Sequence, residues 1–298
     1  DKLMPIAVSE DKFSTRLGMT EIVIKDLNSD KKAKFRCKEL VKNISINGKA
    51  LAVHTLSRIL FYEEYNLYGE GDQQMHVESF SYKPIGKLDK KLEGNFFTLL
   101  AENFILSKDN RISSYDMSKN LSREWVFDSN VCFLKRLGGP AKEECLLVGL
   151  KNGNAFKIFV SNPFPILIIE HGVEITSLDM NLSKKLMAVV DAKNNFYLYD
   201  VAKKESITSE LKISQCMFSQ DFENMYVVMG EGVVYVKSTE FEGVTAPASG
   251  NIISFKGNKV RVVNGETVTT IEVPFTPFLM HYMSKKDFKR SEERRVGK

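Results

Sequence analysis

Short apolar runs alternate with turn-forming polar residues along this chain, and residues 146–160 show the pattern most clearly. An apolar run leads into the pair Asn152-Gly153, and Phe156, Ile158 and Val160 then occupy every second position. Asn-Gly supplies the two positive φ angles that a two-residue hairpin requires, and the alternation indicates a strand with one buried face. This stretch therefore predicts a strand, a tight turn and a second strand.

The same module recurs 40 residues later, in residues 186–200. Residues 191–195 are the expected turn, with Phe196 and Leu198 on one face of the second strand. The module ends in Tyr199-Asp200, where a WD repeat carries Trp-Asp. A four-stranded unit of about 40 residues is typical of a β-propeller blade.

Equivalent units before and after this pair predict an all-β fold, a WD40-like β-propeller of about seven blades. One position in the second strand of each unit recurs at intervals of 53, 42, 40, 39 and 35 residues: Leu51, Phe104, Leu146, Leu186, Met225 and Val260. Insertions in surface loops explain this drift. For the sixth blade the pattern predicts only three strands, at residues 214–218, 225–228 and 233–237.

The first blade is expected to be incomplete. Residues 5–8, 21–27 and 33–40 predict its last three strands, with a polar turn at 28–32. The first strand is expected to be cut away or supplied elsewhere in the ring. The basic cluster at residues 31–34 is interpreted as belonging to a solvated turn. Residues 1–274 are assigned to the propeller.

The strand pattern stops at Pro274. Ser284 followed by Asp287 has the spacing of a capping box, so residues 275–289 are expected to begin a helical region. Residues 290–298 (RSEERRVGK) look like the translation of a sequencing-adapter oligonucleotide, and we interpret them as an assembly artefact. Because the chain begins with Asp1 rather than Met, it is expected to be a fragment.

Composition narrows the class of protein. Hydrophobic residues make up 43% of the chain, which suits an ordinary soluble core, and no apolar run approaches the roughly 20 residues of a membrane span. The net charge is +4, of which residues 290–298 contribute +2, and both signs are interspersed. This argues against a dedicated nucleic-acid-binding protein. The four cysteines (Cys37, Cys132, Cys145 and Cys216) form no Cys-x-x-Cys pair, which favours a reducing compartment over a zinc or redox site.

No local catalytic motif is present. The four histidines are at least 22 residues apart, and the nucleophile elbow, the P-loop and the dinucleotide-binding loop are absent. Gly230-Glu231-Gly232 is interpreted as a hairpin turn. Asp116, Asp191, Asp200 and Glu231 could supply carboxylates to a channel, but Asx-type hydrogen bonds to backbone amides explain the three aspartates better. The sequence therefore nominates no catalytic, cofactor-binding or metal-ligating residue and no cofactor, and the chain is not expected to be an enzyme.

Several segments carry a collinear family resemblance that extends over nearly all of residues 19–288. They are CKELVK (37–42), Glu124-Trp125, Gly138-Gly139-Pro140, LLVGLKNG (146–153), KIFV (157–160), LDM with the following LMAVVD (within 178–191) and EVPFTP (272–277). In these the chain resembles the intraflagellar transport protein 122 family, WD-repeat subunits of the IFT-A complex. The resemblance implies the second of two tandem propellers, followed by a tetratricopeptide-like helical solenoid that would begin at residues 275–289.

The same resemblance implies a scaffold role in cilium assembly, retrograde transport and delivery of membrane proteins into cilia. Implied partners are other IFT-A subunits and ciliary membrane-protein cargo or its adaptors, with no nucleic acid and only an indirect membrane association. The implied location is the cilium, a cytoskeletal cell projection, together with its base and the cytoplasm. Partner-binding residues stay unknown, because the loops at 65–74 and 240–249 depart from the family.

Two alternatives stay open. The first is a propeller that recognises a peptide or a phosphoinositide ligand on its channel or rim in a vesicle-coat-like assembly, which a Lys and Arg cluster at one end would favour. The second is an enzyme, which would require carboxylates or histidines converging at the channel mouth. Phe156, Ile158, Phe196 and Leu198 are expected to be buried between sheets rather than to stack on bases.

Overall fold

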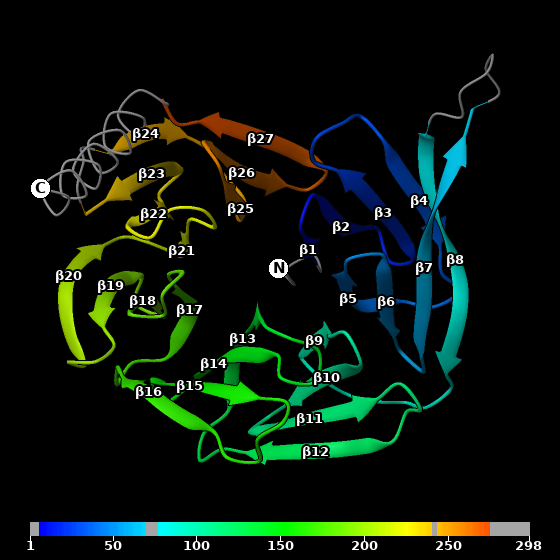
Figure 1. Cartoon of the computed structure of the whole chain (residues 1–298), viewed down its shortest axis with the longest axis horizontal. Helices are drawn as coiled ribbons and strands as arrows, with labels where there is room; N and C mark the ends of the chain where they lie inside the picture. The colour runs from blue at the N-terminus through cyan, green and yellow to red at the C-terminus, as the bar shows by residue number, and fades with distance from the viewer. Residues whose placement is uncertain (1–5, 70–76, 240–242, 275–298) are drawn as a thin grey trace, which may run out of the picture. The chain divides into compact units, whose positions relative to one another are not determined.

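The computed structural model describes residues 6–69, 77–239 and 243–274, and their regular structure is all β (Figure 1). In this part of the chain, 27 strands form seven antiparallel sheets, six with four strands and one with three. Each sheet is a meander whose spatial order follows the chain order. No helix among the described residues is long and apolar enough to span a bilayer.

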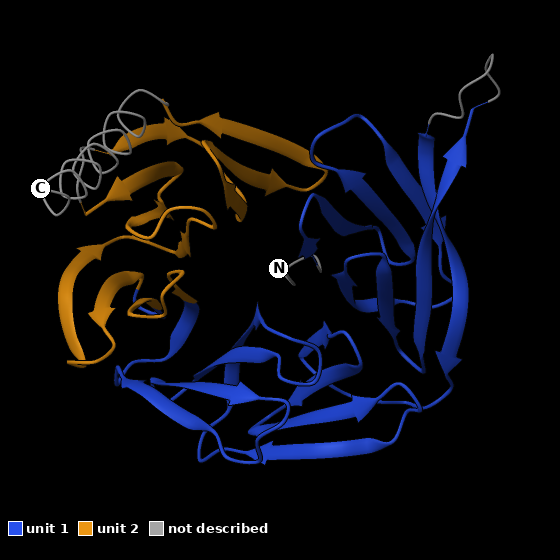
Figure 2. Ribbon diagram, viewed as in Figure 1, with its two compact units in different colours: residues 1–178, 191–193 blue, residues 179–190, 194–298 orange. Residues whose placement is uncertain are grey.

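The chain divides into two compact units, residues 1–178 with 191–193 and residues 179–190 with 194–298 (Figure 2). The first unit contains sheets 1 to 4, and the division passes through sheet 5. Sheet 1 contains β1 (Ile6–Ser9), β2 (Lys12–Leu17), β3 (Glu21–Asp26) and β4 (Lys32–Arg36). Sheet 2 contains β5 (Val41–Asn47), β6 (Ala50–Thr55), β7 (Ile59–Tyr68) and β8 (Val77–Leu88). Sheet 3 contains β9 (Phe96–Leu99), β10 (Asn103–Lys108), β11 (Arg111–Asp116) and β12 (Leu121–Val126). Sheet 4 contains β13 (Val131–Gly138), β14 (Cys145–Leu150), β15 (Asn154–Phe159) and β16 (Ile166–Glu170).

The remaining strands complete sheets 5 to 7. Sheet 5 contains β17 (Ile175–Met180), β18 (Leu186–Asp191), β19 (Asn195–Asp200) and β20 (Glu205–Leu211). Sheet 6 contains β21 (Gln215–Phe218), β22 (Met225–Gly230), β23 (Val233–Ser238) and β24 (Val244–Pro247). Sheet 7 contains β25 (Asn251–Lys256), β26 (Lys259–Asn264) and β27 (Thr267–Glu272).

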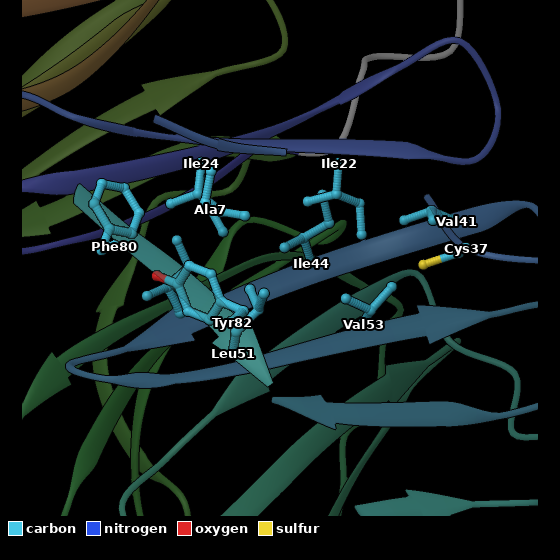
Figure 3. Packing of buried hydrophobic residues seen from close by; sticks show 12 residues of the cluster. Ala7, Ile22, Ile24, Cys37, Val41, Ile44, Leu51, Val53, Phe80 and Tyr82 are labelled. Carbon is cyan, nitrogen blue, oxygen red and sulfur yellow. The ribbon is translucent and has the colours of Figure 1, made fainter. Parts of the chain in front are cut away.

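Neighbouring sheets of the first unit pack their apolar faces together. Between sheets 1 and 2, Ile22 and Ile24 of β3 meet Ile44 of β5 and Leu51 and Val53 of β6 (Figure 3). These side chains are buried, and each contributes about 1.5–3 kcal/mol to folding. Apolar alternation in this chain therefore marks inter-sheet core.

The expected core positions largely agree with this arrangement. Ile158, Phe196 and Leu198 are fully buried. Phe156 is half-buried, and its ring lies 5.2 Å from that of Phe127. The Gly230-Glu231-Gly232 segment forms the turn between β22 and β23, as predicted, with Gly230 paired to Val233.

The expectation of an incomplete first blade is wrong, because sheet 1 has four strands. The missed strand is β2, whose sequence KFSTRL contains only two apolar residues. Its middle residues Ser14 and Thr15 are nevertheless buried. A strand that buries hydroxyl side chains carries no apolar alternation from which to predict it.

Three further expectations change. The basic cluster is not a turn, because Lys32 and Lys34 lie in β4. Sheet 6 has a fourth strand, β24, whose four residues Val-Thr-Ala-Pro give too short a signal to predict. Tyr65 to Tyr68, taken as part of a loop, belong to β7. The predicted helical start at residues 275–289 and the tail at 290–298 lie outside the described residues.

Candidate interaction surface

The carboxylates singled out in the sequence are held by local contacts. Asp116 accepts the Asn120 N–H, Asp191 the Lys193 N–H and Asp200 the Lys203 N–H, each at 3.0 Å. These bonds confirm the Asx-type interpretation of the three aspartates.

Glu231 is exposed in its turn and forms an ion pair of 3.3 Å with Lys212. Among the described residues, no group of three or more His, Cys, Asp and Glu side chains could hold a metal ion.

His171 and Asp191 form a buried pair that the sequence analysis missed. The imidazole Nε2 lies 3.0 Å from Asp191 Oδ2, and the two side chains are 4% and 1% exposed. The pair links the segment after β16 to the turn after β18 and orients both. Sequence reasoning tested the spacing of histidines from one another, whereas this contact joins a histidine to an aspartate 20 residues away.

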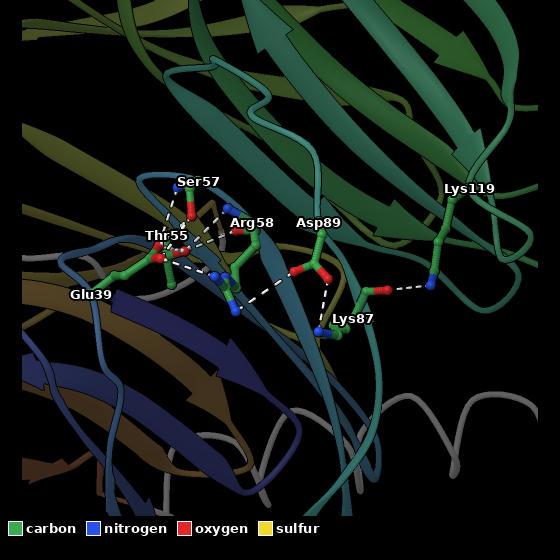
Figure 4. A network of polar contacts seen from close by, with 7 residues as sticks. All are labelled: Glu39, Thr55, Ser57, Arg58, Lys87, Asp89 and Lys119. Carbon is green, nitrogen blue, oxygen red and sulfur yellow. Dashed lines mark hydrogen bonds and ion pairs between the residues drawn. The ribbon is translucent and has the colours of Figure 1, made fainter.

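A polar network connects the loops of sheets 1, 2 and 3 (Figure 4). Glu39 accepts hydrogen bonds from the Ser57 hydroxyl at 2.7 Å and the Thr55 hydroxyl at 2.8 Å, and lies 3.4 Å from Arg58. These hydrogen bonds hold the pKa of Glu39 below its usual value, and the bond from Ser57 has the largest effect.

The network continues from Arg58 to Asp89 at 3.6 Å and from Asp89 to Lys87 at 2.8 Å, while Lys119 donates to the Lys87 carbonyl. Arg58 and Lys87 are thus matched by carboxylates. Lys119 differs, because its contact in this network is a backbone carbonyl rather than a carboxylate.

The outer hairpin of sheet 2 extends beyond the rest of its sheet. β7 and β8 have 10 and 12 residues, whereas β6 has six and pairs with β7 only between Ile59 and Glu63. Beyond that point, residues 64–68 pair with residues 77–82, and the Glu64 N–H still donates to the Lys49 carbonyl in the turn before β6. We call this two-stranded segment the ribbon, and Figure 1 shows the long β7–β8 pair in cyan.

One face of the ribbon is anchored in the core. Phe80 and Tyr82 of β8 are buried in the cluster between sheets 1 and 2 (Figure 3). Lys12 of β2 lies 5.0 Å from the centre of the Phe80 ring and 2.6 Å from the Glu64 carboxylate. The ribbon is therefore fixed to sheet 1 by apolar, cation–π and ionic contacts.

The opposite face carries exposed apolar side chains. Tyr65 is paired with Ser81 and Leu67 with Ser79. Directly opposed residues share a face of the sheet, and small serines leave the larger neighbours uncovered. Tyr65 is 39% exposed and Leu67 43%. Tyr68 follows Leu67 directly in β7, so Tyr68 and its partner Val77 belong to the other face.

We define the ribbon face as Tyr65 and Leu67, which lie two residues apart in β7 and so share one face. Adjacent exposed apolar residues of this kind typically mark interaction sites. Tyrosine is among the residues enriched at protein interfaces. The ribbon face is therefore the candidate interaction surface of the described chain.

Comparison with known proteins identifies the family. The model of the IFT122 second beta-propeller matches residues 7–268. Over 282 residues, which is 95% of the chain, it is 32% identical to the intraflagellar transport protein 122 homologs of Mus musculus and Homo sapiens. It is 30% identical to the homolog of Xenopus tropicalis over the same share. The chain spans only 22–23% of the length of these relatives.

A solved structure supports the fold class independently. A chain in the Crystal Structure of Mitotic Checkpoint Complex superposes with a TM-score of 0.65 at 10% identity, covering 90% of this chain and 89% of that one. At this identity the likeness concerns the fold alone, and together with the seven sheets of this chain it confirms the predicted β-propeller. The family match over residues 7–268 establishes that the chain belongs to the IFT122 second β-propeller family.

Proposed function

We propose that the chain is a non-catalytic protein-interaction module of the intraflagellar transport complex A. In this proposal residues 1–274 form the second propeller and residues 275–289 begin a helical solenoid. The protein would act in retrograde ciliary transport and in delivering membrane proteins, at the cilium, its base and the cytoplasm. Its partners would be other IFT-A subunits and membrane-protein cargo or its adaptors. The names of the relatives and the 32% identity to them support this role.

The family match supports membership of the complex, and the ribbon face is the single observation that carries the protein-interaction role. Its occupant is another protein subunit, because exposed tyrosine and leucine side chains on the two-stranded ribbon match the aromatic and apolar centre of protein interfaces. A small ligand would need a concave site.

The burial of Phe80 and Tyr82 preorganises this surface for binding. Their burial fixes the backbone that presents Tyr65 and Leu67. A surface ordered before binding loses less conformational entropy on association. The ribbon can therefore give strong binding from few side chains.

Substitution of the ribbon face in the full-length protein tests the proposal. Tyr65→Ser combined with Leu67→Ser removes both of its apolar side chains, and Ile207→Ser combined with Leu211→Ser is the matched control, because those residues are exposed on β20. Exposed substitutions usually change the free energy of unfolding by less than about 0.5 kcal/mol, so both variants should stay folded.

The readouts are co-purification of IFT-A subunits and entry of the protein into cilia. The ribbon variant should recover about tenfold less of at least one subunit, in line with an interface hot spot of roughly 1.4 kcal/mol or more. The β20 control should behave as the unmodified protein does. Equal recovery of all subunits by both variants would contradict the proposal.

A further inference from the structure

Strand β4, the outermost strand of sheet 1, displays cations at every second position. Lys32, Lys34 and Arg36 are exposed, whereas Ala33 between them is buried against sheet 2. Phe35 on the buried side lies 4.7 Å, ring to ring, from Tyr62. We call Lys32, Lys34 and Arg36 the β4 stripe.

The backbone of the same three residues faces the free edge of the sheet. Cys37 N–H donates to the Thr20 carbonyl at 2.8 Å, and Asp26 N–H donates to the Lys31 carbonyl at 3.0 Å. The odd-numbered residues along β4 are thus bonded to β3. Alternate residues of an antiparallel strand direct their N–H and C=O groups to opposite sides. The peptide groups of the β4 stripe therefore point to an edge with which no other described strand pairs.

The stripe keeps most of its positive charge. Residues 21–38 hold six basic and three acidic side chains. Glu21 lies 3.3 Å from Lys34, and Asp26 accepts the Asn28 N–H at 2.8 Å. Within the described ranges, no ion pair joins Lys32 or Arg36 to a carboxylate.

We propose that the edge of β4 binds an extended acidic segment of another protein, which adds to sheet 1 as a fifth strand. Side chains at every second residue of any strand are about 6.6–6.8 Å apart, so alternate carboxylates of the added strand meet the three cations in register. Backbone bonds to the edge supply affinity, and the ion pairs supply selectivity.

The linear arrangement favours this occupant over a phosphorylated headgroup. A compact phosphate is held best by donors that converge on one point. The β4 stripe instead spreads its charges along one direction, matched to free peptide groups. This inference rests on sheet 1 alone and stands whether or not the ribbon face binds an IFT-A subunit.

Fluorescence anisotropy with the full-length protein tests the inference. The probe is a labelled octapeptide of alternating Glu and Thr, and the comparison peptide has four Glu followed by four Thr, with the same charge. The alternating peptide should bind about fivefold or more tightly than the blocked one, because only it places carboxylates in register. Binding should weaken strongly between roughly 0.1 M and 1 M salt, where the screening length falls from about 10 Å to about 3 Å.

Charge reversal identifies the site. Lys32→Glu, Lys34→Glu and Arg36→Glu together should weaken binding of the alternating peptide by about tenfold or more, through loss of three pairs and new repulsion. The matched control reverses the exposed cations Lys185, Lys203 and Lys204, and should stay within about twofold of the unmodified protein. Lys32→Arg, Lys34→Arg and Arg36→Lys together should retain binding.

Three outcomes overturn the inference. The first is equal binding of both peptides, and the second is an equal effect of the two charge reversals. The third is that neither peptide binds. In that case, stripe-dependent binding to phosphatidylinositol phosphate vesicles would show that the site takes a lipid headgroup. A variant carrying Thr at positions 32, 34 and 36 is then tested for self-association. Self-association would mean that the lysines only keep this edge from pairing with copies of itself.

Discussion

The indole Nε1–H of Trp125 donates a hydrogen bond to the backbone carbonyl of Asn162 at 2.9 Å. Trp125 is on β12, the outer strand of sheet 3, and Asn162 lies between β15 and β16 of sheet 4. The indole is buried against Leu146 and Ile158 of sheet 4. One side chain thus joins two neighbouring sheets by both apolar packing and a hydrogen bond.

Trp125→Ala should lower the free energy of unfolding by about 3–5 kcal/mol, because it removes the packing and leaves a cavity. Trp125→Phe should cost less, since it keeps most of the packing and loses chiefly the hydrogen bond. Urea titration followed by circular dichroism measures both. Val126→Ala, at the exposed neighbouring position, is the control and should change stability by less than about 0.5 kcal/mol. A loss below about 1 kcal/mol for Trp125→Ala would contradict this account of the interface.

Gly230 and Gly86 should respond oppositely to alanine. A Cβ at Gly230 would lie 1.7 Å from the Lys212 carbonyl oxygen, whereas at Gly86 nothing lies within 4 Å. Gly230→Ala should therefore force a backbone shift and cost about 1–3 kcal/mol or more, as overpacking does. Gly86→Ala should be nearly neutral, within about 0.5 kcal/mol. Thermal unfolding compares the two, and equal melting temperatures would refute the steric argument.

His54 should make the protein less stable in acid. The side chain is fully buried, its Nε2 lies 2.6 Å from the Leu92 carbonyl, and Asn43 donates to its Nδ1 at 3.2 Å. Burial lowers the pKa of His54, an effect that Lys42 reinforces and the Leu92 bond partly opposes. A second proton on Nδ1 would face the Asn43 amide, which already donates there.

Because this pKa is depressed on folding, the contribution of neutral His54 is complete above about pH 6.5, the unfolded value, and is lost as the pH falls toward the folded value. His54→Gln should therefore be destabilising at about pH 8, and the difference from the unmodified protein should narrow at about pH 5. Urea titrations at the two pH values measure this. A difference that stays constant would show that His54 does not titrate as described.

The cysteines should resist alkylation while the protein is folded. Burial raises the pKa of the Cys132 thiol to about 11, and its Sγ lies 2.9 Å from the Ile175 carbonyl. Burial also raises the pKa of Cys37. Few thiolates then exist at neutral pH, so iodoacetamide should label these positions slowly in the native protein and rapidly in denaturant. Mass spectrometry provides the test, and rapid labelling of native Cys132 would contradict its description as a packed thiol.

The repeated sheets could be predicted from the sequence, whereas the interaction surfaces could not. Apolar runs flanking turns such as Asn152-Gly153 located the sheets, because turn chemistry and burial are local properties. Strand β2 could not be predicted, because it buries Ser14 and Thr15 and so lacks an apolar pattern. Its formation depends on packing against the neighbouring sheet.

The sites were harder to predict for the same reason. A run of lysines gives the same sequence pattern in a turn and on an edge strand. The β4 stripe could therefore be recognised only from the pairing of β4 with β3. The exposure of Tyr65 and Leu67 depends on where β6 ends and on what covers Phe80, which are both long-range facts.

Site-specific photocrosslinking at Leu67 tests the central claim most directly. The full-length protein carries a benzophenone amino acid at position 67, and a control protein carries it at position 207, which is also exposed. After irradiation in ciliated cells, crosslinked partners are identified by mass spectrometry. We predict a defined crosslink from position 67 to another IFT-A subunit and none to that subunit from position 207. Crosslinks from position 67 that are absent, or that match those from position 207, would contradict the assignment of the ribbon face as a docking surface.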